Sequence, residues 1–368
     1  MITTRQIRSR LGTLRWRIRI TLWLFAAAAG LAVVGFTHLS ELALEAFHVL
    51  VTDYPWLPLL LTPGLGMLVV WAALRWCPGA QGSGIPQVIA ATRLAAQGRD
   101  IDALVSPRIA IGKVTLGSLA LLGGFSAGRE GPSVQVAASI VHFAHRFMPN
   151  ARVMRPSDLL IAGGAAGIAA AFNTPLAGIV FAVEELGRRL ETRTTAVLLG
   201  TIIIAGLVAI AVLGNYHYFG QLTPGALDYR VIGPVVLCGA LCGVTGGVFG
   251  RLLLWPQRHS EWRVWRWRWG HPVLFAGGWG VGVAVTGVAC GGISFGSGYG
   301  ITAQAIEGQI ELPWYTPLVR ALATVLSFFS GIPGGIFAPA LAVGAGIGFD
   351  VSWLLAGTVG AHSIVALC

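Results

Sequence analysis

Long apolar runs, separated by short polar or glycine-rich stretches, dominate the chain. Several of them approach the roughly 20 residues that a helix needs to cross a bilayer: 20–38, 56–76, 196–213, 231–255, 272–295 and 316–329. Other runs are shorter or contain Gly and Pro: 110–127, 131–147 and 158–183. Because irregular backbone cannot face lipid, the broken runs predict partial or tilted helices buried among the others. The pattern predicts an all-α, polytopic membrane protein.

Two pentapeptides of the first half return in altered form in the second half. Gly-Arg-Glu-Gly-Pro at 128–132 matches Gly-Ile-Phe-Ala-Pro at 335–339, and Gly-Ser-Gly-Ile-Pro at 82–86 matches Gly-Ser-Gly-Tyr-Gly at 296–300. The first pair shares a further property, since each copy ends a glycine-rich break and opens an apolar run. Related halves with Gly- and Pro-broken segments at matching positions are typical of transporters, whose binding site lies at the breaks.

Composition and charge agree with a membrane protein. Of the 368 residues, 55% are hydrophobic and 11% are charged, against about 25% charged residues in soluble proteins. The net charge is +10, and basic residues gather before residue 20 and between 251 and 268, where Trp residues alternate with them. Basic residues mark cytoplasmic ends of spans and Trp marks the lipid interface, so we expect the N-terminus and the 256–270 loop to be cytoplasmic, with the Trp residues of the loop at the lipid interface.

Other partners and cofactors are not indicated. The alternating Arg and Trp residues could in principle bind single-stranded nucleic acid, but membrane anchoring explains both residue types, and no nucleic-acid partner is expected. The five cysteines lie in or beside apolar segments without the spacing of metal ligands. We therefore expect no metal and no cofactor.

The glycine–proline breaks have the composition of loops that turn into helix N-termini. Gly allows a sharp backbone turn, and Pro suits the first helical turn. A helix N-terminus carries unpaired N–H groups and roughly half a positive charge, so it attracts anions. Several such termini converging in the membrane would hold a small anion without a full positive charge, weakly enough for throughput, and the Ser83 hydroxyl would add a donor.

Glu130 is an acidic residue between two glycines at the head of an apolar run. A carboxylate within the membrane is costly and is functional by default. In one interpretation Glu130 caps its own helix or pairs with Arg129, and only stabilises the fold. In the other its carboxylate occupies the anion site and must be protonated or moved aside for transport, because it carries the same charge as a halide.

Glu184 and Glu185 end another apolar segment and are followed by Arg188 and Arg189. A spacing of four residues favours ion pairs on a helix, which predicts a salt-bridged helix end at the membrane surface. The alternative is a proton-accepting carboxylate at the mouth of a cavity. Upstream, Asn-Thr-Pro at 173–175 predicts that one helix stops and another starts.

These motifs together resemble those of the CLC family of chloride channels and proton/chloride antiporters. The stretches 82–86, 128–132 and 335–339 stand in family order, and 165–185 is similar to the family as well. The resemblance covers the chain after its basic tail. It implies a CLC-like inverted-topology repeat with broken, tilted helices, a homodimer, and a place in the plasma (inner) membrane.

The resemblance also implies roles for individual residues. Glu130 would be the external gating glutamate, which competes with the anion and accepts a proton. Glu185 would be the internal proton-transfer glutamate. Ser83 resembles the chloride-type selectivity position. The anion would be bound by side chains or backbone groups at Gly82, Ser83, Gly84, Arg129, Gly131, Ile336 and Phe337.

Glu185 favours proton-coupled chloride antiport, because pure channels of the family often lack this residue. The alternatives are a passive voltage- or pH-gated chloride channel and an inactive membrane fragment or scaffold. An intramembrane enzyme would need a second catalytic group beside Glu130, and the apolar segments offer none. No enzymatic activity is therefore expected.

The pattern divides the chain into a basic cytoplasmic tail (1–19), a first membrane repeat (20–215), a linker (216–230) and a second membrane repeat (231–368). By comparison with the family, the second repeat is incomplete. Helices that would pair with 158–213, and the family's central-site tyrosine, would lie beyond Cys368. These helices contribute to the family's dimer interface, so the homodimer is expected of the complete protein.

Overall fold

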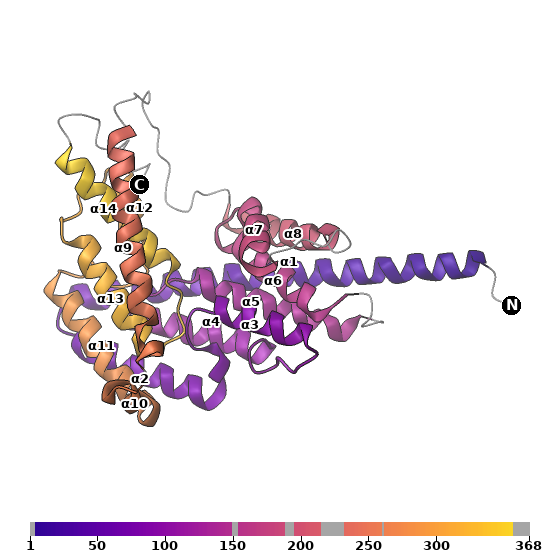
Figure 1. Ribbon diagram of the computed structural model, residues 1–368, viewed down its shortest axis with the longest axis horizontal. Helices are drawn as coiled ribbons and strands as arrows, with labels where there is room; N and C mark the ends of the chain where they lie inside the picture. The colour runs from indigo at the N-terminus through magenta and orange to yellow at the C-terminus, as the bar shows by residue number, and fades with distance from the viewer. Residues whose placement is uncertain (1–3, 149–153, 188–194, 215–231, 260, 356–368) are drawn as a thin grey trace. The chain divides into compact units, whose positions relative to one another are not determined.

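The computed structural model describes residues 4–148, 154–187, 195–214, 232–259 and 261–355, which form helices joined by turns (Figure 1). In chain order the α-helices are α1 (Thr4–Asp53), α2 (Pro58–Trp76), α3 (Ile85–Ala96), α4 (Pro107–Leu122), α5 (Glu130–Phe143), α6 (Pro156–Ala171), α7 (Pro175–Phe181), α8 (Thr195–Leu213), α9 (Ile232–Arg258), α10 (Arg263–Gly270), α11 (Pro272–Ala289), α12 (Tyr299–Ile306), α13 (Thr316–Ser330) and α14 (Phe337–Leu354). Short 3₁₀ helices cover Pro78–Ala80 and Ala144–Phe147, and a π-helix covers Ala182–Gly187. The predicted all-α fold is confirmed.

Five helices in the described part of the chain are long and apolar enough to cross a membrane. They comprise Trp16–Asp53, Pro58–Trp76, Ile232–Pro256, Pro272–Ala289 and Phe337–Leu354. Three shorter apolar helices cover Pro156–Ala171, Leu198–Leu213 and Thr316–Ser330. Each predicted long run thus contains a helix, and the protein is a polytopic membrane protein.

The structure differs from the sequence pattern at three helices. The basic stretch before residue 20 is helical and continuous with the first span in α1, because Arg is a good helix former. α11 ends at Ala289, ahead of two glycines with positive φ, Gly291 and Gly292. α14 is a full-length apolar helix that the predicted spans did not include.

Two compact units make up the chain. The first consists of Met1–Leu39, Arg75–Thr115 and Glu130–Tyr216, and the second of Ser40–Leu74, Leu116–Arg129 and His217–Cys368. The chain therefore passes from the second unit to the first between Arg129 and Glu130. The predicted repeats, 20–215 and 231–368, rest on sequence similarity between two halves, whereas these units are defined by compactness. The repeat boundaries therefore remain a prediction.

The first unit is built around α6, which packs against α3, α5, α7 and α8. Small residues allow this crowding. A Cβ added to Gly167 would lie 2.5 Å from the Ser133 carbonyl oxygen of α5, and one added to Gly163 would lie 2.7 Å from the Ala138 Cα. Such small-residue contacts let helix backbones approach closely where lipid supplies no hydrophobic driving force between helices.

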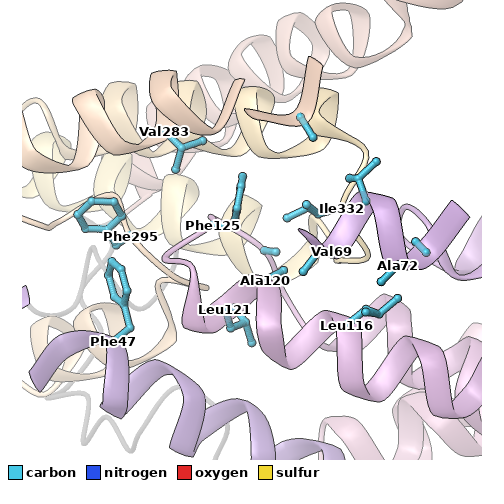
Figure 2. Packing of buried hydrophobic residues seen from close by; sticks show 14 residues of the cluster. Phe47, Val69, Ala72, Leu116, Ala120, Leu121, Phe125, Val283, Phe295 and Ile332 are labelled. Carbon is cyan, nitrogen blue, oxygen red and sulfur yellow. The ribbon is translucent and has the colours of Figure 1, made fainter. Parts of the chain in front are cut away.

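In the second unit, α13 packs against α9, α11 and α14. Its main apolar cluster joins residues from α1, α2, α4, α11 and the loops beside them (Figure 2). Phe47 and Phe295 meet edge to face with ring centroids 4.9 Å apart, a geometry that aromatic pairs prefer. Phe125 lies so close to Gly66 that a Cβ there would come within 2.7 Å of the ring. This cluster fixes the loop that leads from α4 towards Gly128.

α10 carries the Arg and Trp residues expected at the lipid interface. Trp265 is buried against Phe275 and Phe329, whereas Trp269 is 77% exposed. The Arg268 guanidinium lies 5.9 Å from the Phe275 ring centroid, and burial lowers the pKa of Arg268 from its ordinary value. α10 thus anchors one face on α11 and presents other aromatic side chains to its surroundings.

Candidate functional site

The first glycine–proline motif is a loop that turns into α3, as predicted. Gly82 and Gly84 have φ values of 69° and 107°, which glycine adopts without steric cost. α3 begins at Ile85, with proline in its first turn. The Gly84 N–H donates to Gln87 Oε1 at 2.9 Å. The motif therefore presents Ser83 on a sharply turned backbone at a helix start.

Lys113 contacts this loop through hydrogen bonds that the sequence analysis did not predict. It is fully buried in α4, and its Nζ donates to the Ala80 and Gly82 carbonyl oxygens at 2.8 and 2.6 Å. These two hydrogen bonds fix the carbonyl groups of the loop that precedes α3. The available signal was a single Lys inside the apolar run 110–127.

The second motif begins α5 at Glu130, which is 1% exposed. Glu130 stands in the first helical turn, where the helix dipole favours a negative charge. Its neighbour Gly131 touches the first motif, because a Cβ there would overlap Ser83 Oγ and lie 2.9 Å from the Ser83 carbonyl oxygen. A Cβ on Gly84 would in turn lie 2.8 Å from the Gly131 carbonyl oxygen. The first unit therefore brings Ser83, Gly84 and Gly131 together beside Glu130.

The first two residues of the 128–132 motif belong to the second unit. There Gly128 contacts the third motif, 335–339. Gly128 and Gly335 exchange two backbone hydrogen bonds, each 2.7 Å long. Ser126 reinforces this bridge: its N–H donates to Ser327 Oγ at 2.9 Å, and its hydroxyl lies 2.9 Å from Thr324 Oγ1. Hydroxyl groups of α13 thus hold Ser126, two residues before Gly128, in place beside the bridge.

A small cavity of about 10 Å³ adjoins the bridge. Its lining includes Ser126, Ser327, Gly335 and Ile336. This volume is close to that of one water-sized sphere. Ile336 directly precedes α14 and gives it no side-chain cap, and Phe337, which is 46% exposed, is its first residue. Both residues lie at a helix start, as the sequence predicted; their role in anion binding stays a prediction.

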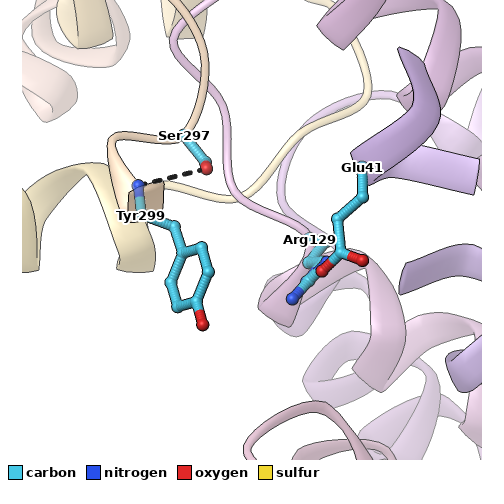
Figure 3. Close-up of polar contacts among 4 residues, drawn as sticks. All are labelled: Glu41, Arg129, Ser297 and Tyr299. Carbon is cyan, nitrogen blue, oxygen red and sulfur yellow. Dashed lines mark hydrogen bonds and ion pairs between the residues drawn. The ribbon is translucent and has the colours of Figure 1, made fainter. Parts of the chain in front are cut away.

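Arg129 is held by side chains of the second unit (Figure 3). Its Nη1 donates to Glu41 Oε1 at 2.8 Å, and its guanidinium lies 5.9 Å from the Tyr299 ring centroid. The Arg129 side chain is 8% exposed and that of Glu41 is 51% exposed. The described ion pair of Arg129 is therefore with Glu41, a partner far away in sequence.

Glu185 has a different environment. Glu184 and Glu185 are both exposed in the π-helix that follows α7. Their predicted partners, Arg188 and Arg189, lie outside the described residues. Upstream, the predicted helix break is confirmed: α6 ends at Ala171, Asn173 has a φ of 56°, and α7 begins at Pro175. Asn173 Nδ2 donates to the Gly214 carbonyl oxygen at 3.0 Å, which ties the break to the end of α8.

A family model described as voltage gated chloride channel matches residues 65–367. The chain belongs to this family, the CLC family. It is 31% identical over 352 residues to an H(+)/Cl(-) exchange transporter ClcA from Cronobacter sakazakii, covering 87% of this chain and 69% of the relative. It is also 31% identical over 313 residues to ClcA from Yersinia pestis, covering 77% and 59%. This CLC chain thus spans less than two thirds of the second relative.

Solved CLC structures share the fold. A slow cyanobacterial Cl⁻/H⁺ antiporter has a TM-score of 0.77 and 22% identity over 95% of this chain and 83% of that one. A CLC-type fluoride/proton antiporter also has a TM-score of 0.77, with 21% identity over 100% of this chain and 86% of that one. Both likenesses show that the chain has the fold of these structures.

Within this CLC chain, the predicted residues fall into separate groups. Ser83, Gly84, Glu130 and Gly131 belong to the first unit, together with Gly82 and Glu185, whereas Arg129, Ile336 and Phe337 belong to the second. Among the described residues, no group of three or more His, Cys, Asp or Glu side chains could hold a metal ion. Within the first unit, the predicted residues bring together the starts of α3 and α5, the Ser83 hydroxyl and the buried Glu130 carboxylate.

Proposed function

We propose that this CLC protein exchanges chloride for protons across the membrane. The observation that carries the proposal is Glu130, a buried carboxylate in the first turn of α5, beside the contact between Ser83 and Gly131. Helix starts attract anions, and Glu130 lies at a helix start, where a titratable carboxyl group would meet the anion. The ClcA relatives, named H(+)/Cl(-) exchange transporters, support the same activity.

The geometry suggests how one site serves both ions. As a carboxylate, Glu130 competes with chloride for the N–H groups and the dipole of α5. Protonation removes this negative charge, so the site then favours chloride. Ser83 donates its hydroxyl hydrogen to the anion, and backbone groups at Gly82, Gly84 and Gly131 of the first unit add further binding groups. The resemblance to the CLC family adds Arg129, Ile336 and Phe337 as proposed anion-binding residues. Proton transfer and anion release are thereby linked at a single residue.

Glu185 is the proposed proton-transfer group on the cytoplasmic side. Its carboxylate is exposed in the π-helix and can exchange protons directly with water, whereas Glu130 is buried. The protein is proposed to lie in the plasma (inner) membrane with a cytoplasmic N-terminus, in contact with lipid at α10, and to form a homodimer. The basic residues before the first span and the Arg/Trp helix α10 support this orientation.

The proposal is tested by reconstituting the protein into liposomes and imposing a chloride gradient while internal pH is recorded. An antiporter moves protons against their own gradient as chloride flows down its gradient. Chloride flow without proton movement would instead identify a passive channel. Absence of both, in liposomes where a ClcA relative is active, would favour an inactive scaffold.

A further inference from the structure

An open groove of about 620 Å³ lies between α10 and α11, within the second unit. Its wall combines the Arg263 side chain with three aromatic rings, those of Trp267, Phe275 and Trp279. Gly278 keeps the α11 side of the groove free, because a Cβ there would meet nothing within 4 Å. The groove is therefore mostly apolar and carries one positive charge in its wall.

Aromatic packing fixes α10 against α11 and so shapes the groove. Trp265 is buried, and its ring lies nearly parallel to that of Trp279 with the centroids 6.4 Å apart. The Trp267 ring lies 5.8 Å from the Phe275 ring. Residues four apart share one face of a helix, which places Arg263 on the same side of α10 as Trp267. The groove is thus part of the folded structure and needs no rearrangement to form.

The exposed side of α10 is basic. The stretch 261–271 contains three arginines and one glutamate. Arg263 and Arg266 are exposed, and neither takes part in an ion pair within the described part of the chain. Residues three apart are neighbours on a helix surface, so the two guanidinium groups lie together at the groove. Glu261 is exposed and likewise makes no described ion pair, so this basic edge is open to an anionic partner.

The groove lies where two membrane spans end. α10 stands between the span Ile232–Pro256 and the span Pro272–Ala289. The groove residues of α11, from Phe275 to Trp279, lie within about 10 Å of Pro272 along the helix axis. Interfacial side chains reach a similar depth, at the boundary between headgroups and acyl chains. A partner in this groove is therefore expected to have both a headgroup and a hydrocarbon part.

We propose that the α10–α11 groove is a selective site for an anionic phospholipid, whose phosphate binds Arg263 and Arg266 and whose acyl chain covers Trp267 and Phe275. The guanidinium fork matches two phosphate oxygens, and basic residues at the membrane surface favour anionic lipids. A zwitterionic lipid would bring its own positive group towards the two arginines. The proposal rests on the lipid contact of α10 proposed above, and it adds a preferred lipid class that is independent of chloride and proton exchange.

The test is native mass spectrometry of the purified, delipidated protein in detergent. The probes are phosphatidylglycerol and phosphatidylcholine with identical acyl chains, so that they differ only in the headgroup. We expect one phosphatidylglycerol to bind at least about ten-fold more tightly than phosphatidylcholine, because several arginines act together. Binding is the readout, so the result does not depend on whether the protein exchanges chloride for protons.

Arg263→Gln tests the role of the charge. It is expected to weaken phosphatidylglycerol binding about five-fold or more, with phosphatidylcholine binding unchanged. Arg75→Gln is the matched control, since Arg75 is an exposed basic residue at the end of another span, α2, and does not line the groove. Arg75→Gln should leave the affinity for phosphatidylglycerol as it is in the unaltered protein.

Gly278→Phe tests the role of the groove and leaves every arginine in place. The open space at Gly278 accepts the ring, which then occupies the volume assigned to the acyl chain. Val281→Phe is the matched control, because Val281 lies on the same helix, is 45% exposed and does not line the groove. Gly278→Phe is expected to weaken phosphatidylglycerol binding about ten-fold, a loss similar to that of burying one or two methylene groups, and Val281→Phe to leave it unchanged.

Four outcomes would overturn the proposal. Equal binding of the two lipids, weakened by Gly278→Phe, would keep α10 in lipid contact but remove the selectivity. Unchanged affinity in both Arg263→Gln and Gly278→Phe would place the lipid elsewhere. Displacement of phosphatidylglycerol by inorganic phosphate at equal concentration would mark a site for soluble phosphate. A protein dimer that Gly278→Phe dissociates, with or without lipid, would mark the groove as an interface between two copies of the chain.

Discussion

Glu130 and Glu185 are both proposed to move protons, yet they differ in burial and in the kind of helix that holds them. Glu130 is 1% exposed and opens α5, next to the tight contact between Gly131 and Ser83. Glu185 is exposed within a short π-helix. A buried carboxylate at a helix start can compete with an anion for the same N–H groups, whereas an exposed one can only exchange protons with water. Substitutions of the two residues should therefore have different effects on proton and chloride flux.

The largest effect is expected from Glu130→Ala. Without this carboxylate the anion site cannot be occupied by an internal competitor, so chloride flux should persist while coupled proton flux falls by about 100-fold or more. Parallel chloride-electrode and pH recordings on liposomes measure both fluxes. An unchanged chloride-to-proton ratio would remove Glu130 from the exchange step.

A smaller effect is expected from Gly131→Ala, which tests the packing around Glu130. The added methyl group would overlap Ser83 Oγ and crowd the Ser83 carbonyl oxygen, and overpacking costs about 1–3 kcal/mol. Thermal unfolding in detergent measures the loss of stability. Gly239→Ala is the matched control, because a Cβ at Gly239 meets nothing within 4 Å; equal stability of the two variants would contradict the tight contact.

The next smaller effect is expected from Glu185→Gln. Loss of one exposed proton carrier should lower coupled proton flux roughly ten-fold, equivalent to about 1.4 kcal/mol, without stopping chloride flux. Glu184→Gln is the matched control on the same π-helix and should leave both fluxes unchanged. If the two variants behaved alike, the salt-bridged helix end would be the better interpretation of both glutamates.

The smallest effect is expected from Glu41→Gln. Glu41 is half-exposed, and its ion pair with Arg129 holds the residue next to Glu130. Loss of such a pair costs about 1 kcal/mol or less, so stability should fall slightly while proton coupling is kept. Loss of coupling in Glu41→Gln would show that the environment of Glu130 depends on the Arg129 side chain.

Local chemistry made several parts of this structure predictable. Gly84, Glu130 and Phe337 stand at helix starts because Gly and Pro have strong, local backbone preferences, and the break at Asn173 follows from the same rules. The contacts of Lys113 with Ala80 and Gly82, and of Arg129 with Glu41, depend on how distant segments pack. No local pattern specifies such partners. The positions of the motifs could therefore be predicted from the sequence, whereas the charged side chains that contact them could not.

The shared role of Glu130 in anion and proton binding is tested most directly by counting protons taken up when chloride binds. Chloride titrations of the purified protein, in two buffers with different ionisation enthalpies, give this number by calorimetry. Chloride that displaces the Glu130 carboxylate should be accompanied by proton uptake in the wild-type protein and by almost none in Glu130→Ala. Equal proton uptake in the two proteins would contradict competition between this carboxylate and chloride.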